Sequence, residues 1–88
     1  MTFEFNGMML RLADNQRTVP ITATTLSAAL TELTSKFPHM KRVLLDNTGQ
    51  LRQAHRVLLN NELIIRPPGT MPLSQDDRIE FFTAIAGG

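Results

Sequence analysis

The sequence predicts an α+β fold, in which a mixed sheet of four to five strands packs against one main helix. Three observations support this fold class. Residues 2–6 and 78–82, near the two ends of the chain, alternate apolar and polar side chains as half-buried strands do. A stretch between them has apolar residues at helical spacing. Because 88 residues have room for one hydrophobic core, these elements must share it.

The first strand is followed by two candidate turns. The Asn-Gly pair at residues 6–7 is a hairpin signal, but it would leave an unusually short strand. Residues 13–16 would instead join a longer arm through residues 10–12 to a second strand at residues 18–21. We prefer this second turn and interpret the glycine as a bulge. Pro20 lacks the N–H of a central strand, so the second strand should lie at a sheet edge.

The main helix is predicted to begin after Thr25, whose hydroxyl can accept a hydrogen bond from the first turn. Its apolar residues form a single stripe: Leu26, Ala29, Leu30, Leu33 and Phe37. Pro38 ends the helix, and Lys36 suits the negative pole of its dipole.

The second half of the chain reads as sheet. Its predicted elements are a short helical or extended segment at 42–45, a turn at 46–49, strands at 56–59 and 63–65, a proline-rich loop at 67–72, and a last strand at 78–82. We expect residues 1–82 to form one domain and residues 83–88 to form an extended tail that ends in Gly-Gly.

Composition excludes several classes of protein. Nine Lys and Arg against eight Asp and Glu leave a net charge of +1, so we expect no nucleic-acid binding. The apolar runs are far shorter than the roughly 20 residues of a membrane span, and the start lacks the features of a signal peptide. We therefore expect no membrane association and a cytoplasmic location.

The chain has no cysteine, which excludes disulfides, thiolate metal sites and a cysteine nucleophile. His39 and His55 have no second ligand at useful spacing, so we predict no metal site and no catalytic residue. A further set of cations is interpreted as a solvated face rather than a patch for an acidic partner: Lys36, Lys41, Arg42, Arg52 and Arg56.

The last residues carry the strongest functional signal. Residues 83–88 are small and uncharged, and they follow the last strand without a turn. Gly87 and Gly88 have no Cβ and can enter a narrow channel. Five residues of this tail can reach about 17 Å, enough to bring the terminal carboxylate into a partner's active site. That carboxylate is ionised at neutral pH and can attack a nucleotide phosphate.

These features resemble the ubiquitin-like sulfur carriers of the ThiS, MoaD and CysO type over essentially the whole length. The matching residues are Leu73, Asp77, Ile79-Glu80-Phe81-Phe82 and Ala84-Ile85-Ala86-Gly87-Gly88. Residues 46–51 and 59–62 are similar to the CysO-like branch. One departure is Gln75-Asp76-Asp77, where relatives commonly have a glycine before the acidic residue. The resemblance implies a β-grasp, ubiquitin-like fold.

The resemblance also implies a chemistry. An adenylating enzyme of the ubiquitin-activating type would consume ATP and join the Gly88 carboxylate to AMP. A sulfur donor would then displace AMP, and the resulting thiocarboxylate would supply a sulfur-accepting enzyme that makes cysteine, thiamin or another thio-metabolite. The chain would be a co-substrate without a permanently bound cofactor, and Gly87 and Gly88 would be its reactive end.

Partner recognition is expected from the last strand and the tail. Alternation places Ile79 and Phe81 on one face and Arg78 and Phe82 on the other, so Phe82 should be an exposed anchor. We assign partner binding to Arg78, Phe82, Ala84, Ile85 and Ala86, with Ile85 inserted into a partner groove. The alternative is that Phe82 and Ile85 fold back over the domain.

Three rival functions remain open. The chain could be the small subunit of molybdopterin synthase, which would make it part of an enzyme. It could be a protein modifier, with Gly88 joined to lysines by isopeptide bonds. It could also be an interaction module in which the terminal glycines have no role.

Overall fold

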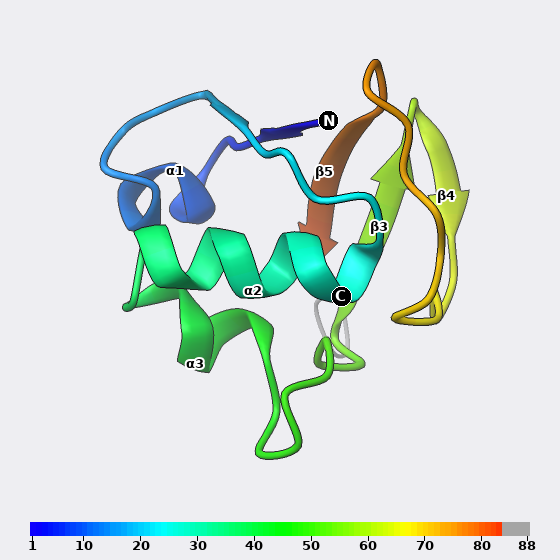
Figure 1. Ribbon diagram of the computed structural model, residues 1–88. Coiled ribbons are helices and arrows are strands. Elements are labelled where there is room, and N and C mark those ends of the chain that lie inside the picture. Colours follow the sequence, from blue (N-terminus) through cyan, green and yellow to red (C-terminus); the bar gives the residue numbers. More distant parts are fainter. Residues whose placement is uncertain (84–88) are drawn as a thin grey trace.

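The computed structural model of the chain describes residues 1–83 (Figure 1). In chain order its elements are β1 (Thr2–Glu4), α1 (Met8–Leu12), β2 (Thr18–Pro20), α2 (Leu26–Lys36), α3 (Met40–Leu44), β3 (His55–Leu59), β4 (Glu62–Ile64) and β5 (Arg78–Thr83). The predicted tail residues 84–88 lie outside the described residues. The last strand extends one residue further than expected, to Thr83.

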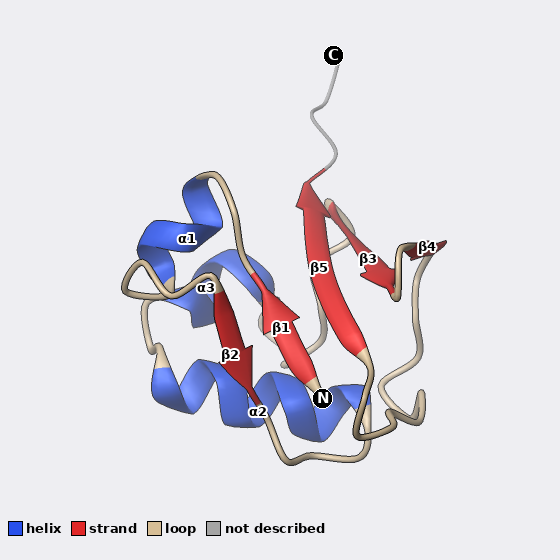
Figure 2. Cartoon of the chain, turned by 90° about the horizontal axis from the view of Figure 1, so that it is seen from above, coloured by secondary structure: helices blue, strands red, loops and turns tan. Residues whose placement is uncertain are grey.

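The strands form one five-stranded sheet in the order β2-β1-β5-β3-β4. β1 and β5 are parallel, and the other neighbours are antiparallel. Helix α2 lies across one face of this sheet (Figure 1, Figure 2). The predicted mixed sheet packed on one main helix is confirmed.

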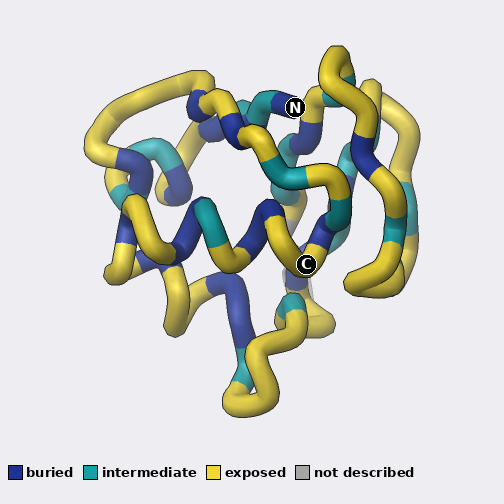
Figure 3. The backbone as a smooth tube through the Cα atoms, viewed as in Figure 1, coloured by how far each residue is buried: buried dark blue, intermediate teal, exposed yellow. Residues whose placement is uncertain are grey.

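Helix α2 forms for the reasons that the sequence suggested. The Thr25 hydroxyl accepts a hydrogen bond of 3.3 Å from the Ala28 N–H, and the helix ends at Lys36, before Pro38. All five residues of its predicted apolar stripe are buried. They pack against fully buried residues of the sheet such as Phe3, Val57 and Ile79, so the core lies between α2 and the sheet (Figure 3).

β2 is an edge strand, as Pro20 predicts. Its ladder pairs Pro20 with Thr2 and Val19 with Phe3. The missing N–H of Pro20 therefore disturbs no second neighbour.

The predicted extended arm at residues 10–12 is wrong, because this stretch belongs to helix α1. Gly7 has φ 59°, a left-handed conformation that glycine adopts without steric cost, and the backbone turns there into the helix. Met9 is buried under this turn. The glycine is thus the start of a helical connection rather than a bulge. The predicted turn at residues 13–16 is present, with Asp14 and Asn15 also at positive φ.

Between α2 and β3, the helical alternative is the correct one. Residues 40–44 form α3, which buries Met40 and Leu44. The turn that follows is held by Asp46, whose carboxylate accepts hydrogen bonds from the Thr48 and Gln50 amides at 2.8 Å and 3.0 Å. No helix within residues 1–83 is long and apolar enough to cross a bilayer.

Candidate functional site

Strand β5 leads towards the C-terminal residues from the middle of the sheet. Its first half pairs with β1, from Arg78 to Glu80, and its residues from Ile79 to Thr83 pair with β3. The last pair joins Thr83 to His55. The backbone from which residues 84–88 continue is therefore held by a complete ladder on one side. The predicted site residues Ala84, Ile85, Ala86, Gly87 and Gly88 lie outside the described residues.

The inner face of β5 fixes the orientation of the strand. Ile79 is fully buried, and the Phe81 ring stacks with Phe3 at 5.4 Å and with Phe5 at 6.3 Å between ring centroids. Because successive side chains of a strand point to opposite faces, this packing turns Phe82 outward. The predicted alternation is confirmed, and Phe82 is 58% exposed.

Phe82 belongs to a group of apolar side chains on the face of the sheet opposite α2. In the ladders, Leu58 lies opposite Leu63 on β4 and opposite Glu80 on β5, and Phe82 lies opposite Arg56, two pairs further along. Leu58 is half-buried, whereas Leu63 is 51% exposed. We call Leu58, Leu63 and Phe82 the outer apolar patch. Exposed apolar side chains that gather beside a functional segment are typical of a protein-binding surface.

Arg78 and Phe82, both predicted to bind a partner, share this face but are not neighbours. They are four residues apart on one strand, about 13 Å along it. An Nη atom of Arg78 lies 3.5 Å from an Oε atom of Glu4 on β1. The arginine beside Phe82 is Arg56, in the opposite position on β3.

Sequence reasoning missed the contribution of β3 and β4 to this surface. The sequence alone assigns Arg56 to a solvated basic face and Leu58 and Leu63 only to strands. The alternation within residues 56–59 puts Arg56 and Leu58 on one face, which was a usable signal. The two-residue turn at Asn60 and Asn61 then fixes Leu63 opposite Leu58.

A hydrogen-bonded cluster holds the start of β5 to the β3–β4 turn. Asp77 accepts bonds from the Ser74 amide at 2.7 Å and from the Asn60 side chain at 2.9 Å. Asn60 in turn accepts a bond of 2.9 Å from the Arg78 amide. The bond from the Ser74 amide, followed by that from Asn60, lowers the pKa of Asp77 from its ordinary value of 3.8. The acidic residue of this turn therefore has a structural role.

The two histidines of the chain lie in different surroundings. His39 is exposed at the start of α3, without a side-chain capping bond. His55 is buried, with its Nε2 2.6 Å from the Val43 carbonyl oxygen. Within residues 1–83, no three side chains of His, Asp or Glu gather in a way that could hold a metal ion. This part of the chain presents exposed apolar side chains beside the last strand.

Comparison with known proteins agrees with this geometry. The model of the ThiS family matches residues 3–88, which include the C-terminal glycines. No curated protein sequence matches the chain.

Several solved structures share the fold. The solution structure of small archaeal modifier protein 1 from Methanosarcina acetivorans superposes with a TM-score of 0.83 at 20% identity, covering 99% of this chain and 94% of that one. CysO in the Amycolatopsis orientalis BexX/CysO complex superposes with a TM-score of 0.82 at 18% identity, covering 99% of this chain and 98% of that one. Mycobacterium tuberculosis CysO, an antigen, superposes with a TM-score of 0.80 at 18% identity, covering 96% of this chain and 98% of that one. The architecture is the β-grasp, ubiquitin-like fold.

Proposed function

The chain belongs to the ThiS family of ubiquitin-like sulfur carriers and modifiers, and we propose that it carries sulfur on the carboxyl group of Gly88. Small proteins of the ThiS type are generally not enzymes. We accordingly assign this chain the role of a co-substrate, which is modified by one enzyme and consumed by another.

The proposed reaction has two steps. In the first, the Gly88 carboxylate attacks the α-phosphorus of ATP on an adenylating enzyme, which forms an acyl adenylate and releases pyrophosphate. In the second, the sulfur of a hydrosulfide-type donor attacks the acyl carbon and AMP leaves, so that one carboxylate oxygen is replaced by sulfur. The thiocarboxylate then passes its sulfur to an acceptor enzyme, and hydrolysis restores the carboxylate.

The observation that carries this proposal is the family match, which extends to Gly87 and Gly88 on a chain whose last described strand ends at Thr83, a few residues before them in the sequence. In this reaction the side chains of the chain are needed only for recognition by the partner enzymes. ATP is bound and consumed by the activating enzyme, so the chain itself needs no resident cofactor. We place the cycle in the cytoplasm, where ATP is available.

We further propose that the adenylating enzyme docks on the outer apolar patch. Phe82 and Leu63 are more than half exposed, and Arg56 lies directly opposite Phe82, while Glu80 lies opposite Leu58 on the same face. Aromatic and arginine side chains are the usual energetic anchors of protein interfaces. The likeness to CysO, which was crystallised with BexX, supports a mode of action through a partner protein. The proposed acceptor is a biosynthetic enzyme that makes cysteine, thiamin or another thio-metabolite.

The test is the mass of the intact protein after incubation with a candidate adenylating enzyme, ATP and sulfide. A thiocarboxylate has the same nominal mass as a methionine sulfoxide, and the chain has five methionines. An iodoacetamide probe separates the two, because a thiocarboxylate is readily alkylated and the chain has no cysteine. We expect one adduct, mapped to Gly88. The control is a variant that lacks Gly87 and Gly88.

An adduct on the truncated variant, or none on the full chain with any adenylating enzyme of the same cell, would contradict the proposal. A stable complex that makes molybdopterin from its precursor would assign the chain instead to molybdopterin synthase. In that case it would be the small subunit of an enzyme.

The second candidate function is that of a protein modifier, which the likeness to small archaeal modifier protein 1 favours. Here Gly88 would end in isopeptide bonds to lysines of other proteins. Conjugate ladders in cell lysate that disappear when Gly88 is deleted would support this function. If a thiocarboxylate forms and no conjugate ladder is found, sulfur transfer is the function and protein modification is not.

A further inference from the structure

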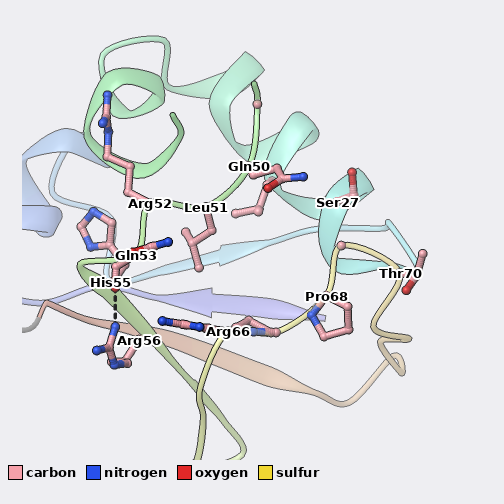
Figure 4. Close-up of a pocket in the computed structure, with 14 residues that line it drawn as sticks. Ser27, Gln50, Leu51, Arg52, Gln53, His55, Arg56, Arg66, Pro68 and Thr70 are labelled. Atoms are coloured by element: carbon pink, nitrogen blue, oxygen red, sulfur yellow. Dashed lines mark hydrogen bonds between the residues drawn. The ribbon is translucent and has the colours of Figure 1, made fainter. Parts of the chain in front are cut away.

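A pocket of about 560 Å³ lies between α2, the segment of residues 49–53, the start of β3 and the segment of residues 66–70 (Figure 4). Its volume is in the range of sites for small molecules. Part of its wall is apolar, formed by Leu30, Leu51 and Pro68. The sequence did not indicate it, because its lining comes from four separate stretches of the chain.

One wall is fixed to the helix. The Ser27 amide donates a hydrogen bond of 2.9 Å to the Gly69 carbonyl, and the Leu26 amide donates one of 3.0 Å to the Met71 carbonyl. A Cβ on Gly69 would lie only 3.2 Å from the Ser27 Cβ, so the loop sits closely on α2. The adjacent Pro68 further restricts this backbone.

The opposite wall is fixed to the end of α3. The Asp46 carboxylate caps the turn, and the hydrogen bonds from Thr48 and Gln50 lower its pKa from the ordinary value of 3.8. The Arg52 amide donates a bond of 2.7 Å to the Leu44 carbonyl. Both walls are thus held by backbone hydrogen bonds, which makes the pocket pre-formed.

The charge of the pocket is one-sided. Arg52, Arg56 and Arg66 line it, whereas no Asp or Glu does. Among residues 1–83 the ion pair present is that of Arg78 and Glu4, so none of these three guanidinium groups is paired with a carboxylate there. Asp46 lies near enough to Arg52 to interact with its charge, so the one-sided charge of the pocket is that of Arg56 and Arg66. Two like charges on one pocket favour binding of an anion.

Hydrogen bonds to backbone carbonyls orient two of the guanidinium groups. Arg52 donates its Nε–H to the Arg42 carbonyl at 2.9 Å, and Arg56 donates to the Gln53 carbonyl. Figure 4 shows Arg66 directed along the pocket towards Arg56. Each guanidinium has five N–H groups, so these bonds leave others available.

The backbone of Arg66 adds a second observation. Its φ is 53°, in the left-handed region that is unfavourable for a side chain with a Cβ. Glycine would adopt this conformation freely. The chain therefore accepts a strained residue at the position from which a guanidinium reaches into the pocket, and such strain is typical of binding sites.

We propose that this pocket binds a small phosphorylated molecule, whose phosphate oxygens are held between Arg56 and Arg66. Arginine forms paired hydrogen bonds with phosphate, and all three cations of the pocket are arginines. Leu30 and Leu51 contact the less polar part of the ligand. The proposal does not depend on sulfur transfer. Since Arg56 also belongs to the surface beside Phe82, the test changes Arg66 and leaves Arg56 in place.

The experiment is a titration of the isotope-labelled full chain with inorganic pyrophosphate at low ionic strength, followed by backbone amide resonances. We expect saturable shifts confined to residues 49–56 and 66–70, with a dissociation constant below about 1 mM. Arg66→Gln should weaken binding about tenfold, because it removes one of the two guanidinium groups that hold the phosphate. The matched control is Arg11→Gln, which removes the same charge from exposed α1 and should change the affinity less than twofold.

A second variant separates binding from folding. Arg66→Gly removes the guanidinium and relieves the positive φ, so it should be at least as stable as the original chain and still bind about tenfold more weakly. Equal weakening by Arg11→Gln, or shifts spread over α1 as well, would overturn the proposal in favour of general charge attraction. Equally tight binding of citrate would overturn the assignment to phosphate.

Discussion

Phe82 allows the proposed docking surface to be tested separately from the stability of the fold. It is 58% exposed, on the face of the sheet opposite the core, so its truncation removes little packing. We expect Phe82→Ala to lower kcat/KM for thiocarboxylate formation at least tenfold, as the loss of an interface anchor does. The thermal midpoint should change by only about 2 °C or less. Alkylation kinetics with the adenylating enzyme and a melting curve measure the two effects.

The control for this prediction is Met8→Ala. Met8 is 87% exposed, but it lies on α1, away from the outer apolar patch. It should leave both the rate and the thermal midpoint unchanged. If the two variants reduce the rate equally, the outer apolar patch is not the docking surface.

Asp77 is the opposite case, a polar residue whose role is stability. Its carboxylate holds the Ser74 amide and the Asn60 side chain at the start of β5. We expect Asp77→Ala to lower the free energy of unfolding at neutral pH by about 1 kcal/mol, since two exposed hydrogen bonds are lost. Urea denaturation measures this. Asp76→Ala, at the exposed neighbouring carboxylate of the same turn, should change the free energy by less than about 0.5 kcal/mol.

At the scale of elements, the sequence predicts what depends on neighbours along the chain. The α2 stripe from Leu26 to Phe37 spans three turns, so its period is unambiguous, and Thr25 and Pro38 mark both ends. Pro20 identifies the edge strand by a single missing N–H. These features need no knowledge of the rest of the molecule.

Helix α1 could not be predicted in this way. It has five residues, fewer than two turns, and the Leu-Arg-Leu run at residues 10–12 has the same alternation as a strand. Its formation depends on Gly7 turning the backbone and on the core accepting Met9, and the second condition is a property of the folded molecule. The local pattern of residues 10–12 fits a helix or a strand, and tertiary packing determines that they form a helix.

The β3–β4 turn offers a prediction for an element. Asn60 and Asn61 have φ of 52° and 70°, the conformation of a two-residue hairpin turn in which glycine is preferred at the second position. Asn61→Gly should therefore raise the free energy of unfolding by about 0.5 kcal/mol, and Asn61→Val should lower it by about 1 kcal/mol or more.

Both turn variants are compared with the original chain by urea denaturation, with the same dependence of the free energy of unfolding on urea concentration for all three. Asn60 is left unchanged because its side chain bonds to Asp77 and to the Arg78 amide. If Asn61→Val is as stable as the original chain, the turn does not hold the left-handed conformation in solution.

At the scale of the whole molecule, the two candidate surfaces are products of topology. The outer apolar patch joins β3, β4 and β5, and the arginine pocket joins residues from four stretches. The sequence identified Phe82 by alternation within one strand, but it placed Arg78 rather than Arg56 beside it. Only the register of β3 against β5 makes Arg56 the neighbour. Pairing between distant strands is information that local patterns do not contain.

The pH dependence of stability also belongs to the whole molecule, because two carboxylates hold two different connections. Asp46 caps the turn before β3, and Asp77 caps the turn before β5. Hydrogen bonds lower the pKa of both from 3.8 in the folded state. A group whose folded pKa is lowered contributes stability above its unfolded pKa and loses it as the pH falls through the folded value.

We therefore expect the free energy of unfolding to be nearly constant from pH 7 to about pH 5 and to decrease steadily below about pH 4. The double variant Asp46→Asn and Asp77→Asn should be less stable at pH 7, because neutral amides accept weaker hydrogen bonds, and should lose less stability on acidification. Urea denaturation at pH 3, 5 and 7 measures both. An unchanged acid slope in the double variant would mean that other carboxylates control acid unfolding. A reduced slope would instead show that these two caps, one beside the arginine pocket and one at the start of β5, contribute to the acid unfolding of the whole chain.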